Sequence, residues 1–336
     1  MADVAVVIIN YRTPELTIRC VEALVGEKKQ LPQLRVVVVD GGSADGSAAK
    51  LAEFVERPGL DWVSFLPLST NGGFGWANNQ AMLELARDED PPEFIHLLNP
   101  DAEVTGGAVS ALVAALHANP RCGAAGSQLI NSEGKPAASA FRFPSPGREF
   151  IAGAQSEKLG SLLGIGSTVV SSDSEVDWVT GASVMLRADA LREVGLFDDG
   201  FFLYFEEVEL MHRLRSHGWS VRHVPQSRVV HIEGASTGIG AAAAERAHPA
   251  YWYDSRRRYF ALTSGRASVV AANLAVVAGK AAARSKILIG RSARATACRL
   301  KDLLGHGFLP SGSDALPSVP RWGDAPGTLP AWMTRK

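Results

Sequence analysis

Cysteine is scarce in this chain of 336 residues, and the three that occur, Cys20, Cys122 and Cys298, have no metal-ligand spacing. An odd number of isolated cysteines implies no disulfide framework and fits a reducing compartment. Long uninterrupted apolar runs are missing as well, so a membrane-spanning helix is not expected. The opening stretch MADVAVVIINYR has no basic leader before its apolar run. We therefore expect no secretory signal and a cytoplasmic location.

An excess of positive charge is also missing. The chain has 34 basic and 35 acidic residues and a formal net charge of −1. This balance argues against a nucleic-acid-binding protein that works through bulk positive charge. The hydrophobic content of 46% is enough for one large domain or two moderate ones with a packed core.

Short apolar runs rich in β-branched residues predict the start of the fold. Val4–Asn10 and Arg35–Asp40 are such runs, and a segment compatible with a helix, residues 14–26, separates them. Runs without polar alternation are typical of strands that are buried on both faces of a parallel sheet. The sequence therefore predicts an α/β fold. Two further strands are predicted over residues 62–68 and 94–99, with a helix between them over residues 76–86.

Each of these strands ends in a polar or glycine-rich turn, at the edge where open parallel sheets bind their ligands. The turns are NYRTPE, DGGSADGS, NGGFGWANN and NPDAEV. Each alone is compatible with an ordinary loop, because Asn, Asp, Gly and Ser are common turn formers. The G-x-G-x-x-G pattern of dinucleotide-binding sites does not follow the first strand, and a P-loop is missing. The edge is predicted to bind another kind of ligand.

Six motifs in a fixed order make the chain resemble the family 2 glycosyltransferases of GT-A fold, most closely their bacterial rhamnosyltransferase-like branch. The resemblance covers about residues 4 to 260. It departs from the family pattern at Gly41, where the family often has Asn, and at Glu207, where it often has Asp. The motifs are VVIINYRTPE, VVVVDGGSADGS, NGGFGWANNQAM, HLLNPDAEV, VTGASVMLRADALREVGLFDDGFFLYFEEVELMHRLRSHGW and VVHIEGAST.

The resemblance implies an inverting glycosyltransferase that moves a sugar from a nucleoside diphosphate to a hydroxyl of a glycan acceptor. The expected donor is dTDP-rhamnose, and the expected acceptor is linked to a polyprenyl diphosphate in bacterial cell-envelope synthesis. A UDP- or GDP-sugar donor with a soluble or other lipid-linked acceptor stays open, as does a catalytically idle relative that only binds the nucleotide-sugar. A sugar-nucleotide pyrophosphorylase is disfavoured, because NYRTPE lacks the glycine-rich loop and lysine that such an enzyme needs.

The resemblance also implies roles for residues at the turns. A divalent cation, Mg²⁺ or Mn²⁺, would neutralise the leaving diphosphate. Asp101 is its expected ligand and His231 matches the position of a second one, with a plain turn and a structural histidine as the alternatives. Asp40 would accept a hydrogen bond from the imide N–H of uracil or thymine. The other residues expected around the nucleotide-sugar are Asn10, Tyr11, Arg12, Asn71, Gly73, Asn79 and Asn99.

The stretch FLYFEEVELM places three carboxylates at the start of a helix predicted over residues 206–217. Acids are favoured in the first helical turn by the helix dipole, so ordinary surface acids are the alternative to a catalytic role. By resemblance, Glu207 is the base that takes the proton of the acceptor hydroxyl, and we expect it to be ionised at neutral pH. Glu209 is expected to pair with Arg213 at i+4. The acceptor is expected to contact Glu206, Gly181, Ala182 and Ser183.

The later part of the chain has another character. From Ser255 to Lys301 there is no Asp or Glu among eleven basic residues. Such a stretch predicts basic amphipathic helices on an anionic membrane surface, at the inner face of the cell membrane. A soluble extension or a dimer contact is the alternative. The predicted plan is a catalytic domain over 1–260, with a donor half 1–101 and an acceptor half 102–260 that contains a mobile connection at 142–172, then a helical extension over 261–309 and a loosely ordered Pro/Gly-rich tail over 310–336.

Overall fold

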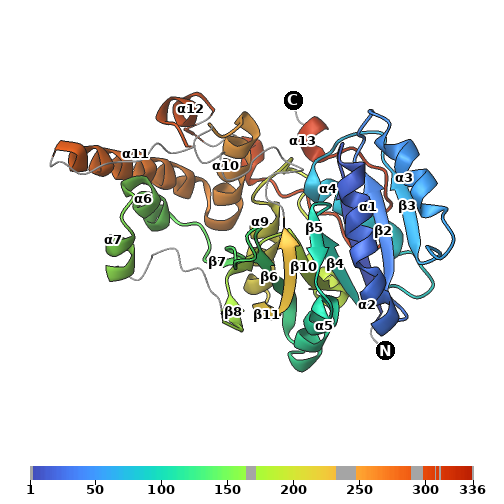
Figure 1. Cartoon of the computed structure of the whole chain (residues 1–336). Helices are drawn as coiled ribbons and strands as arrows, with labels where there is room; N and C mark the ends of the chain where they lie inside the picture. The colour runs from blue at the N-terminus through green and yellow to red at the C-terminus, as the bar shows by residue number, and fades with distance from the viewer. Residues whose placement is uncertain are drawn as a thin grey trace.

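The computed structural model describes residues 3–163, 172–231, 247–288, 298–306, 308–309 and 312–334. A central sheet has helices on both faces, and a layer of helices from the later part of the chain lies beside it (Figure 1). The strands and helices predicted for the first hundred residues are confirmed. They are β1 (Val4–Asn10), α1 (Pro14–Ala23), α2 (Val25–Gln30), β2 (Arg35–Asp40), α3 (Ser47–Val55), β3 (Val63–Pro67), α4 (Phe74–Leu85) and β4 (Phe94–Leu98).

The rest of the chain completes the sheet and adds the helical layer. The predicted helix of the three glutamates is confirmed as α9. The elements are β5 (Ala102–Val104), α5 (Ala108–Ala118), β6 (Cys122–Ile130), β7 (Ala140–Phe141), α6 (Pro146–Ala154), α7 (Glu157–Leu162), β8 (Ser174–Val176), β9 (Trp178–Val179), β10 (Ser183–Arg187), α8 (Ala188–Val194), α9 (Glu206–Ser216), β11 (Ser220–His231), α10 (Ala250–Ser264), α11 (Arg266–Leu288), α12 (Leu300–Gly305), a 3₁₀ turn (Gly312–Ala315) and α13 (Ala331–Thr334).

The sheet is parallel in its first half and mixed in its second. Its order is β3-β2-β1-β4-β10-β6-β11-β5, with β8 paired to β11. β1 runs parallel to β2 and β4, whereas β10 is antiparallel to β4 and β6. Asn10 lies opposite Asp40 in the register of β1 and β2. The turns after β1, β2 and β4 are therefore gathered at one edge of the sheet, as the sequence predicts.

Alternate residues of β1 pack into two different hydrophobic cores, one on each face of the sheet. Val4, Val6 and Ile8 pack into the core that includes residues of α1, α3 and α5, and Ala5 and Val7 pack into the core that includes residues of α4, α8 and α9. Side chains of successive strand residues point to opposite faces, so an apolar residue at every position is needed to fill both cores. This two-sided burial explains why β1 reads as an uninterrupted apolar run.

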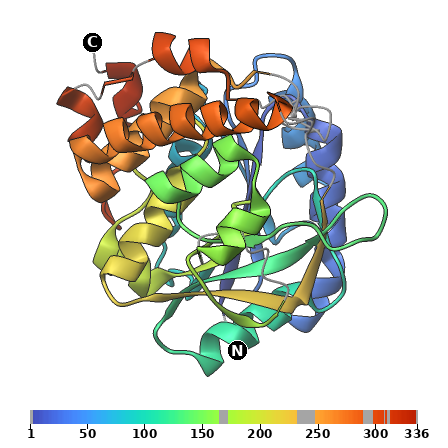
Figure 2. The same cartoon turned by 90° about the vertical axis from the view of Figure 1, so that its left-hand side faces the viewer.

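The connection at 142–172, expected to be mobile, contains helices α6 and α7 within the residues that the structure describes. α11 lies across α6 (Figures 1 and 2). Small residues permit this close crossing, because a Cβ at Gly279 would lie 2.4 Å from the Phe150 carbonyl oxygen and one at Gly153 would lie 3.0 Å from the Val276 carbonyl oxygen. Residues 164–171 of the connection lie outside the described part of the chain.

Helix α11 contains one segment, Arg266–Ser285, that is long and apolar enough to cross a membrane by length and composition, with a mean hydropathy of 1.2. The sequence expectation of no such segment is therefore not met. One third of the segment is buried against the rest of the protein. The core helices of many soluble proteins have the same length and composition, so this finding alone does not assign α11 to a membrane.

Three of the basic residues expected to face a membrane, Arg256, Arg257 and Arg258, lie instead in ion pairs within the fold. This part of the sequence prediction is wrong, because the acids that neutralise them come from distant segments. Their closest N···O distances are 3.0 Å to Glu149, 2.7 Å to Asp314 and 2.6 Å to Asp198, respectively.

The tail, expected to be loosely ordered, runs back along α4 and the loop that precedes α9. We call residues 316–334 the strap. The Leu196 N–H donates to the Pro320 carbonyl at 2.9 Å, and the Trp76 indole N–H donates to the Thr328 carbonyl at 2.8 Å. These bonds tie the strap to the start of α4 and to the loop that precedes α9.

Candidate active site

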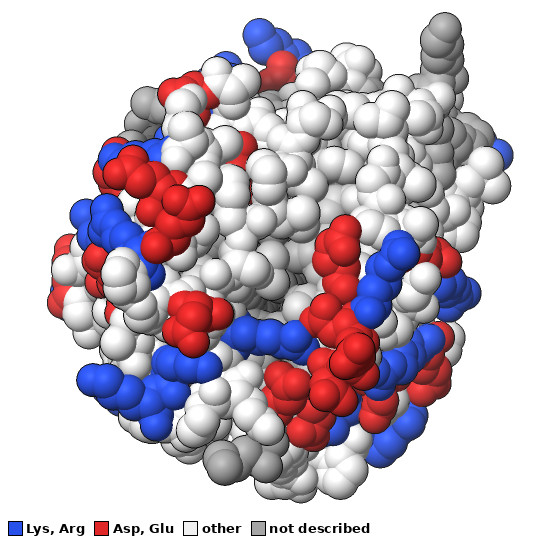
Figure 3. Space-filling model, turned by 90° about the vertical axis from the view of Figure 1, so that its right-hand side faces the viewer, with Lys and Arg blue, Asp and Glu red and all other residues white. Residues whose placement is uncertain are grey.

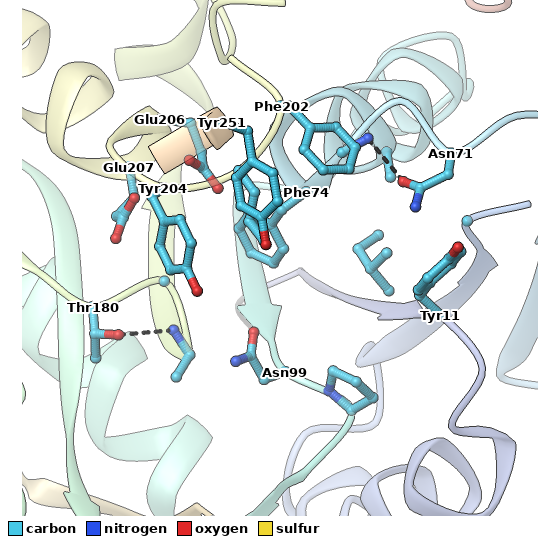
Figure 4. A pocket seen from close by; sticks show the side chains of 18 residues that line it. Tyr11, Asn71, Phe74, Asn99, Thr180, Phe202, Tyr204, Glu206, Glu207 and Tyr251 are labelled. Carbon is cyan, nitrogen blue, oxygen red and sulfur yellow. Dashed lines mark hydrogen bonds between the residues drawn. The ribbon is translucent and has the colours of Figure 1, made fainter. Parts of the chain in front are cut away.

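A cavity of about 340 Å³ opens at the carboxyl edge of the sheet (Figure 4). Its walls come from the ends of β1 and β4, the turns after β2, β3 and β9, the loop that leads into α9, and α10. Segments from far apart in the chain therefore meet at this one site. The lining residues are Ile9, Tyr11, Gly41, Asn71, Gly73, Phe74, Ala77, Asn99, Pro100, Thr180, Gly181, Ala182, Phe202, Leu203, Tyr204, Glu206, Glu207 and Tyr251.

The ends of β1 and β2 are joined by a buried polar network. The Asn10 amide donates to Asp40 Oδ1 at 2.7 Å, and Asp40 also accepts from the Ser43 hydroxyl at 2.6 Å and the Ser43 N–H at 3.0 Å. Tyr11 lines the cavity, whereas Asn10 and Asp40 lie behind the wall and Arg12 bonds to the Ser43 carbonyl at 3.1 Å. Of the four residues predicted here, the structure brings Tyr11 to the cavity and uses the others to fix the turns around it.

The turn after β3 is held against the loop that leads into α9. Gly73 has a φ of +94°, and a Cβ there would lie 1.8 Å from the Phe202 carbonyl oxygen, so a side chain does not fit. The Phe74 N–H donates to the same oxygen at 3.2 Å, and the Asn71 side chain accepts from the Gly73 N–H at 3.1 Å. Residues 71–74, which we call the donor loop, are thus fixed relative to Phe202.

Asn79 lies away from the cavity. Its side-chain amide donates to the Phe197 carbonyl at 2.8 Å and to Asp199 Oδ1 at 2.7 Å, and its oxygen accepts from the Phe197 N–H at 3.0 Å. Burial raises the pKa of Asp199 to about 7. Asn79, predicted to contact the nucleotide-sugar, therefore joins α4 to the loop before α9.

The candidate metal ligands face one another. Asp101 Oδ1 lies 3.2 Å from His231 Nε2, and the Asn99 amide nitrogen lies 3.4 Å from the same ring atom. A carboxylate oxygen and an imidazole nitrogen suit Mn²⁺ or Mg²⁺ to different degrees, so the donor set fits a divalent cation. Among the described residues, no group of three or more His, Cys, Asp or Glu side chains forms a complete site. Residues 232–237 of the VVHIEGAST motif lie outside the described residues.

Glu206 and Glu207 begin α9 and both line the cavity (Figure 4). Burial raises the pKa of Glu206 well above its ordinary value, and the charge of Glu207 raises it further. Burial also raises the pKa of Glu207 to about 7, which corrects the expectation that it is fully ionised at neutral pH. The dipole of α9 favours the charged form, but loss of hydration outweighs it here. Within the described residues, Glu206 Oε2 has no hydrogen-bond partner.

Glu209 has a different task from its neighbours. It accepts from Arg213 at 2.9 and 2.7 Å, which confirms the predicted i+4 pair. Arg213 also donates to the carbonyl groups of Val194 and Leu196 at 2.7 and 2.8 Å. The pair therefore holds α9 against the end of α8 and is not part of the cavity wall.

Four aromatic residues of the cavity wall, Phe74, Phe202, Tyr204 and Tyr251, were not predicted as site residues. Tyr251 comes from α10, and its ring stacks on Tyr204 with centroids 6.1 Å apart and meets the edge of Phe202 at 5.3 Å. The cluster AYWYDS ahead of the basic residues was the available signal. Aromatic rings and a few polar groups in one concave site are typical of small-molecule binding.

The turn between β9 and β10 is only partly at the cavity. Gly181 and Ala182, which are expected to contact the acceptor, line it. Ser183 is fully buried and directs its hydroxyl to His96 Nε2 at 2.9 Å and Ser127 Oγ at 2.7 Å. Ser183 belongs to β10, where it contributes to a polar contact inside the sheet, so its predicted position at the acceptor is wrong.

Comparison with known sequences places this chain in a family. The model of "Glycosyl transferase family 2" matches residues 5–165 and that of "Glycosyl transferase family group 2" matches residues 159–289. N-acetylglucosaminyl-diphospho-decaprenol L-rhamnosyltransferase of Mycobacterium tuberculosis is 30% identical over 227 residues, 63% of this chain and 71% of the relative. The low-salt glycan biosynthesis hexosyltransferase Agl10 of Haloferax volcanii is 23% identical over 213 residues, 63% of this chain and 62% of the relative.

Solved structures show the same architecture. The mannosyltransferase PcManGT from Pyrobaculum calidifontis, solved with GDP-Man and Mn²⁺, aligns with a TM-score of 0.53 at 15% identity, over 87% of this chain and 76% of that one. GalNAc-T7, solved with UDP, GalNAc and Mn²⁺, aligns with a TM-score of 0.56 at 15% identity, over 78% of this chain and 48% of that one. At this identity the likeness establishes the GT-A fold, as predicted.

Proposed function

The chain belongs to the family 2 glycosyltransferases, in their rhamnosyltransferase-like branch, and we propose that it transfers L-rhamnose from dTDP-rhamnose to a polyprenyl-diphosphate-linked N-acetylglucosamine. Glycosyltransferase activity follows from the family. The choice of donor and acceptor is supported by the mycobacterial relative, whose name specifies rhamnosyl transfer to a lipid-linked N-acetylglucosamine.

The observation that carries the proposal is the pair of adjacent glutamates on the wall of a cavity at the carboxyl edge of the sheet, with Glu206 buried and Glu207 half-buried. The two carboxyl groups have different environments, so their protons leave at different pH. Near neutral pH, Glu207 is partly ionised and can accept a proton. Burial and the charge of Glu207 both raise the pKa of Glu206, which favours the protonated form that can donate a hydrogen bond.

In the proposed reaction, Glu207 takes the proton of the acceptor hydroxyl as that oxygen bonds to the anomeric carbon. The bond from this carbon to the diphosphate breaks, its electron pair leaves with the nucleoside diphosphate, and a single displacement inverts the configuration. Glu206 binds another acceptor hydroxyl through its Oε2, which has no hydrogen-bond partner among the described residues. The rings of Tyr204 and Tyr251 provide apolar surface for the acceptor sugar.

A divalent cation fits the other end of the site. Asp101 and His231 would hold it beside the donor diphosphate, with the remaining ligands from the diphosphate and water. When bound, the cation supplies charge stabilisation to the leaving group. Asn99 lines the cavity next to this pair, which supports its proposed contact with the donor.

We expect purified protein to release dTDP from dTDP-rhamnose only when the polyprenyl-linked N-acetylglucosamine is added. Release of nucleoside diphosphate is measured with dTDP-rhamnose, UDP-sugars and GDP-sugars in parallel. Faster acceptor-dependent release of UDP or GDP would show that the donor is a UDP- or GDP-sugar and not dTDP-rhamnose. Nucleotide binding without transfer from any donor would identify the chain as a catalytically idle relative.

Glu207→Gln should lower kcat by about 10² to 10⁴, because glutamine keeps the size of the side chain but cannot take a proton. The donor Kd, measured by calorimetry, should stay within about twofold. The wild-type kcat should rise about tenfold per pH unit below pH 7 and level off above it, because only the ionised base is active.

The matched variant for this test is Glu206→Gln, which keeps a neutral hydrogen-bonding group in place of the protonated acid. It should retain more than about a tenth of the wild-type kcat and keep the same rise with pH. A larger loss of kcat in Glu206→Gln than in Glu207→Gln would mean that Glu206 is the base and that Glu207 binds the acceptor hydroxyl.

Removal of divalent cations with EDTA should abolish transfer, and Mg²⁺ or Mn²⁺ should restore it, because the leaving diphosphate then regains its charge stabilisation. Asp101→Asn should raise the concentration of Mn²⁺ needed for half-maximal rate by at least about tenfold, since a charged ligand becomes neutral. Full turnover in excess EDTA would remove Asp101 and His231 from this role.

We also propose that the protein works at the inner face of the cell membrane, where a polyprenyl-linked acceptor resides. The face shown in Figure 2 carries α6, α7 and α11. Exposed leucines occur here, with Leu162 81% and Leu274 55% exposed, and Arg266 and Arg284 are exposed on α11. On the opposite side of the molecule, basic and acidic side chains are interspersed (Figure 3), which gives no attraction of one sign. Arg291 and Arg294 lie outside the described residues.

The protein should sediment with anionic liposomes in 50 mM salt and be released by high salt, because screening weakens attraction to the surface. Replacing both Arg266 and Arg284 with Glu should lower the partition coefficient at least about thirtyfold, given about 1 kcal/mol for each basic residue. Arg57→Glu, at the end of α3, serves as the control. Equal partition of all variants, or no binding in 50 mM salt, would favour a soluble extension.

A further inference from the structure

We propose that Trp332, in the strap, is a positioning residue that fixes the donor loop relative to the segment that carries Glu206 and Glu207. The strap lies outside both family models, whose matches end at residues 165 and 289. Its sequence, rich in Pro, Gly and Ser, gives no indication of a role at the site. The inference rests on the proposed function for its kinetic readout only.

The strap is anchored first at a buried ion pair. The Arg258 guanidinium binds Asp198 at 2.6 Å and also donates to the Leu316 carbonyl at 2.8 Å. The Ser318 N–H donates to Asp198 Oδ2 at 3.0 Å, and the Asp199 N–H donates to the Ser318 carbonyl at 2.8 Å. Because Asp198 and Arg258 are almost completely buried, this end of the strap is held by the fold itself.

A second set of bonds lays the strap along α4. The Gly327 N–H donates to Gln80 Oε1 at 2.6 Å, and the Trp76 indole N–H donates to the Thr328 carbonyl at 2.8 Å. Both partners lie on α4, the helix that begins at the donor loop. The strap is therefore directed toward the donor loop before it reaches Trp332.

Trp332 contacts both walls of the cavity from behind. Its indole N–H donates to the Gly72 carbonyl of the donor loop at 2.9 Å. Its ring packs edge-on against Phe202, with centroids 5.0 Å apart, and its backbone N–H donates to the Asp199 carbonyl at 3.3 Å. One side chain thus touches the donor loop and the start of the segment that leads to the glutamates.

The backbone of residues 202–205 needs contacts with other parts of the fold to hold its conformation. Tyr204 and Phe205 both have left-handed backbone conformations, with φ values of 71° and 68°. Such conformations are costly for residues other than glycine and persist where the surroundings hold them. Phe202, just before them, is held on one side by Trp332 and on another by Tyr251. Holding both walls in place before the substrates arrive lowers the entropy cost of assembling the site.

Three single variants in the full chain separate positioning from general stability. Trp332→Phe keeps an aromatic ring against Phe202 but removes the bond to Gly72. Trp332→Ala removes both contacts. Trp322→Ala is the matched control, because Trp322 belongs to the same strap but packs on Arg192, with the guanidinium carbon 5.1 Å from the ring, and does not line the cavity.

Trp332→Phe should raise the donor KM about three- to tenfold with kcat and the acceptor KM within about twofold, as expected for loss of one hydrogen bond to the donor loop. Trp332→Ala should in addition lower kcat at least about fivefold, because the segment before Glu206 loses a contact. Trp322→Ala should leave these constants within about twofold of wild type, although its Tm falls by as much as that of Trp332→Phe.

Hydrogen exchange of the free protein provides a readout that does not depend on transfer. Both Trp332 variants should speed amide exchange in residues 71–77, and Trp332→Ala also in residues 200–205, whereas Trp322→Ala should not. Faster exchange in a protein whose wild type transfers no sugar would support the positioning role while the proposed function fails. Equal exchange and equal donor KM in the Trp332 and Trp322 variants would overturn the inference.

Discussion

The site depends on the backbone contact between Gly73 and the Phe202 carbonyl. A Cβ at residue 73 would lie 1.8 Å from that oxygen, so this approach is possible only for glycine. The contact joins the donor loop, from the first half of the chain, to the loop that leads into α9, where Glu206 and Glu207 lie. Asn79 strengthens the same joint by bonding to Phe197 and Asp199. The walls of the cavity that come from residues 71–74 and from the loop before α9 are thereby held at a fixed separation.

Close packing of the loop before α9 against its neighbours also sets the pKa values of Glu206 and Glu207. Enclosure by aromatic residues removes water from the carboxylates, which raises both pKa values, while the dipole of α9 acts in the opposite sense. Desolvation is the larger effect. Two carboxyl groups with raised pKa values on one cavity wall are the arrangement that the proposed transfer of a proton from the acceptor requires.

The basic residues of α10 illustrate how charge can be misread from sequence. Arg256 and Arg258 are buried and paired with Glu149 and Asp198, so they contribute little to the outer surface. A buried pair is retained only with good geometry and further hydrogen bonds, which Arg258 has through the Leu316 carbonyl. The pair of Arg258 and Asp198 therefore links α10, the loop between α8 and α9, and the strap.

The sequence by itself determined the features that arise from local patterns. Uninterrupted β-branched runs gave β1 and β2 at their observed bounds, the i+4 spacing gave the pair of Glu209 and Arg213, and six ordered motifs indicated the family. Only the tertiary structure decided the raised pKa of Glu207, the place of Tyr251 in the cavity, the inward turn of Ser183 and the course of the strap. These depend on contacts across long stretches of chain, such as the bond from Trp332 to Gly72 over 260 residues. No local pattern encodes such a contact, because it exists only once the sheet has brought both segments to one edge.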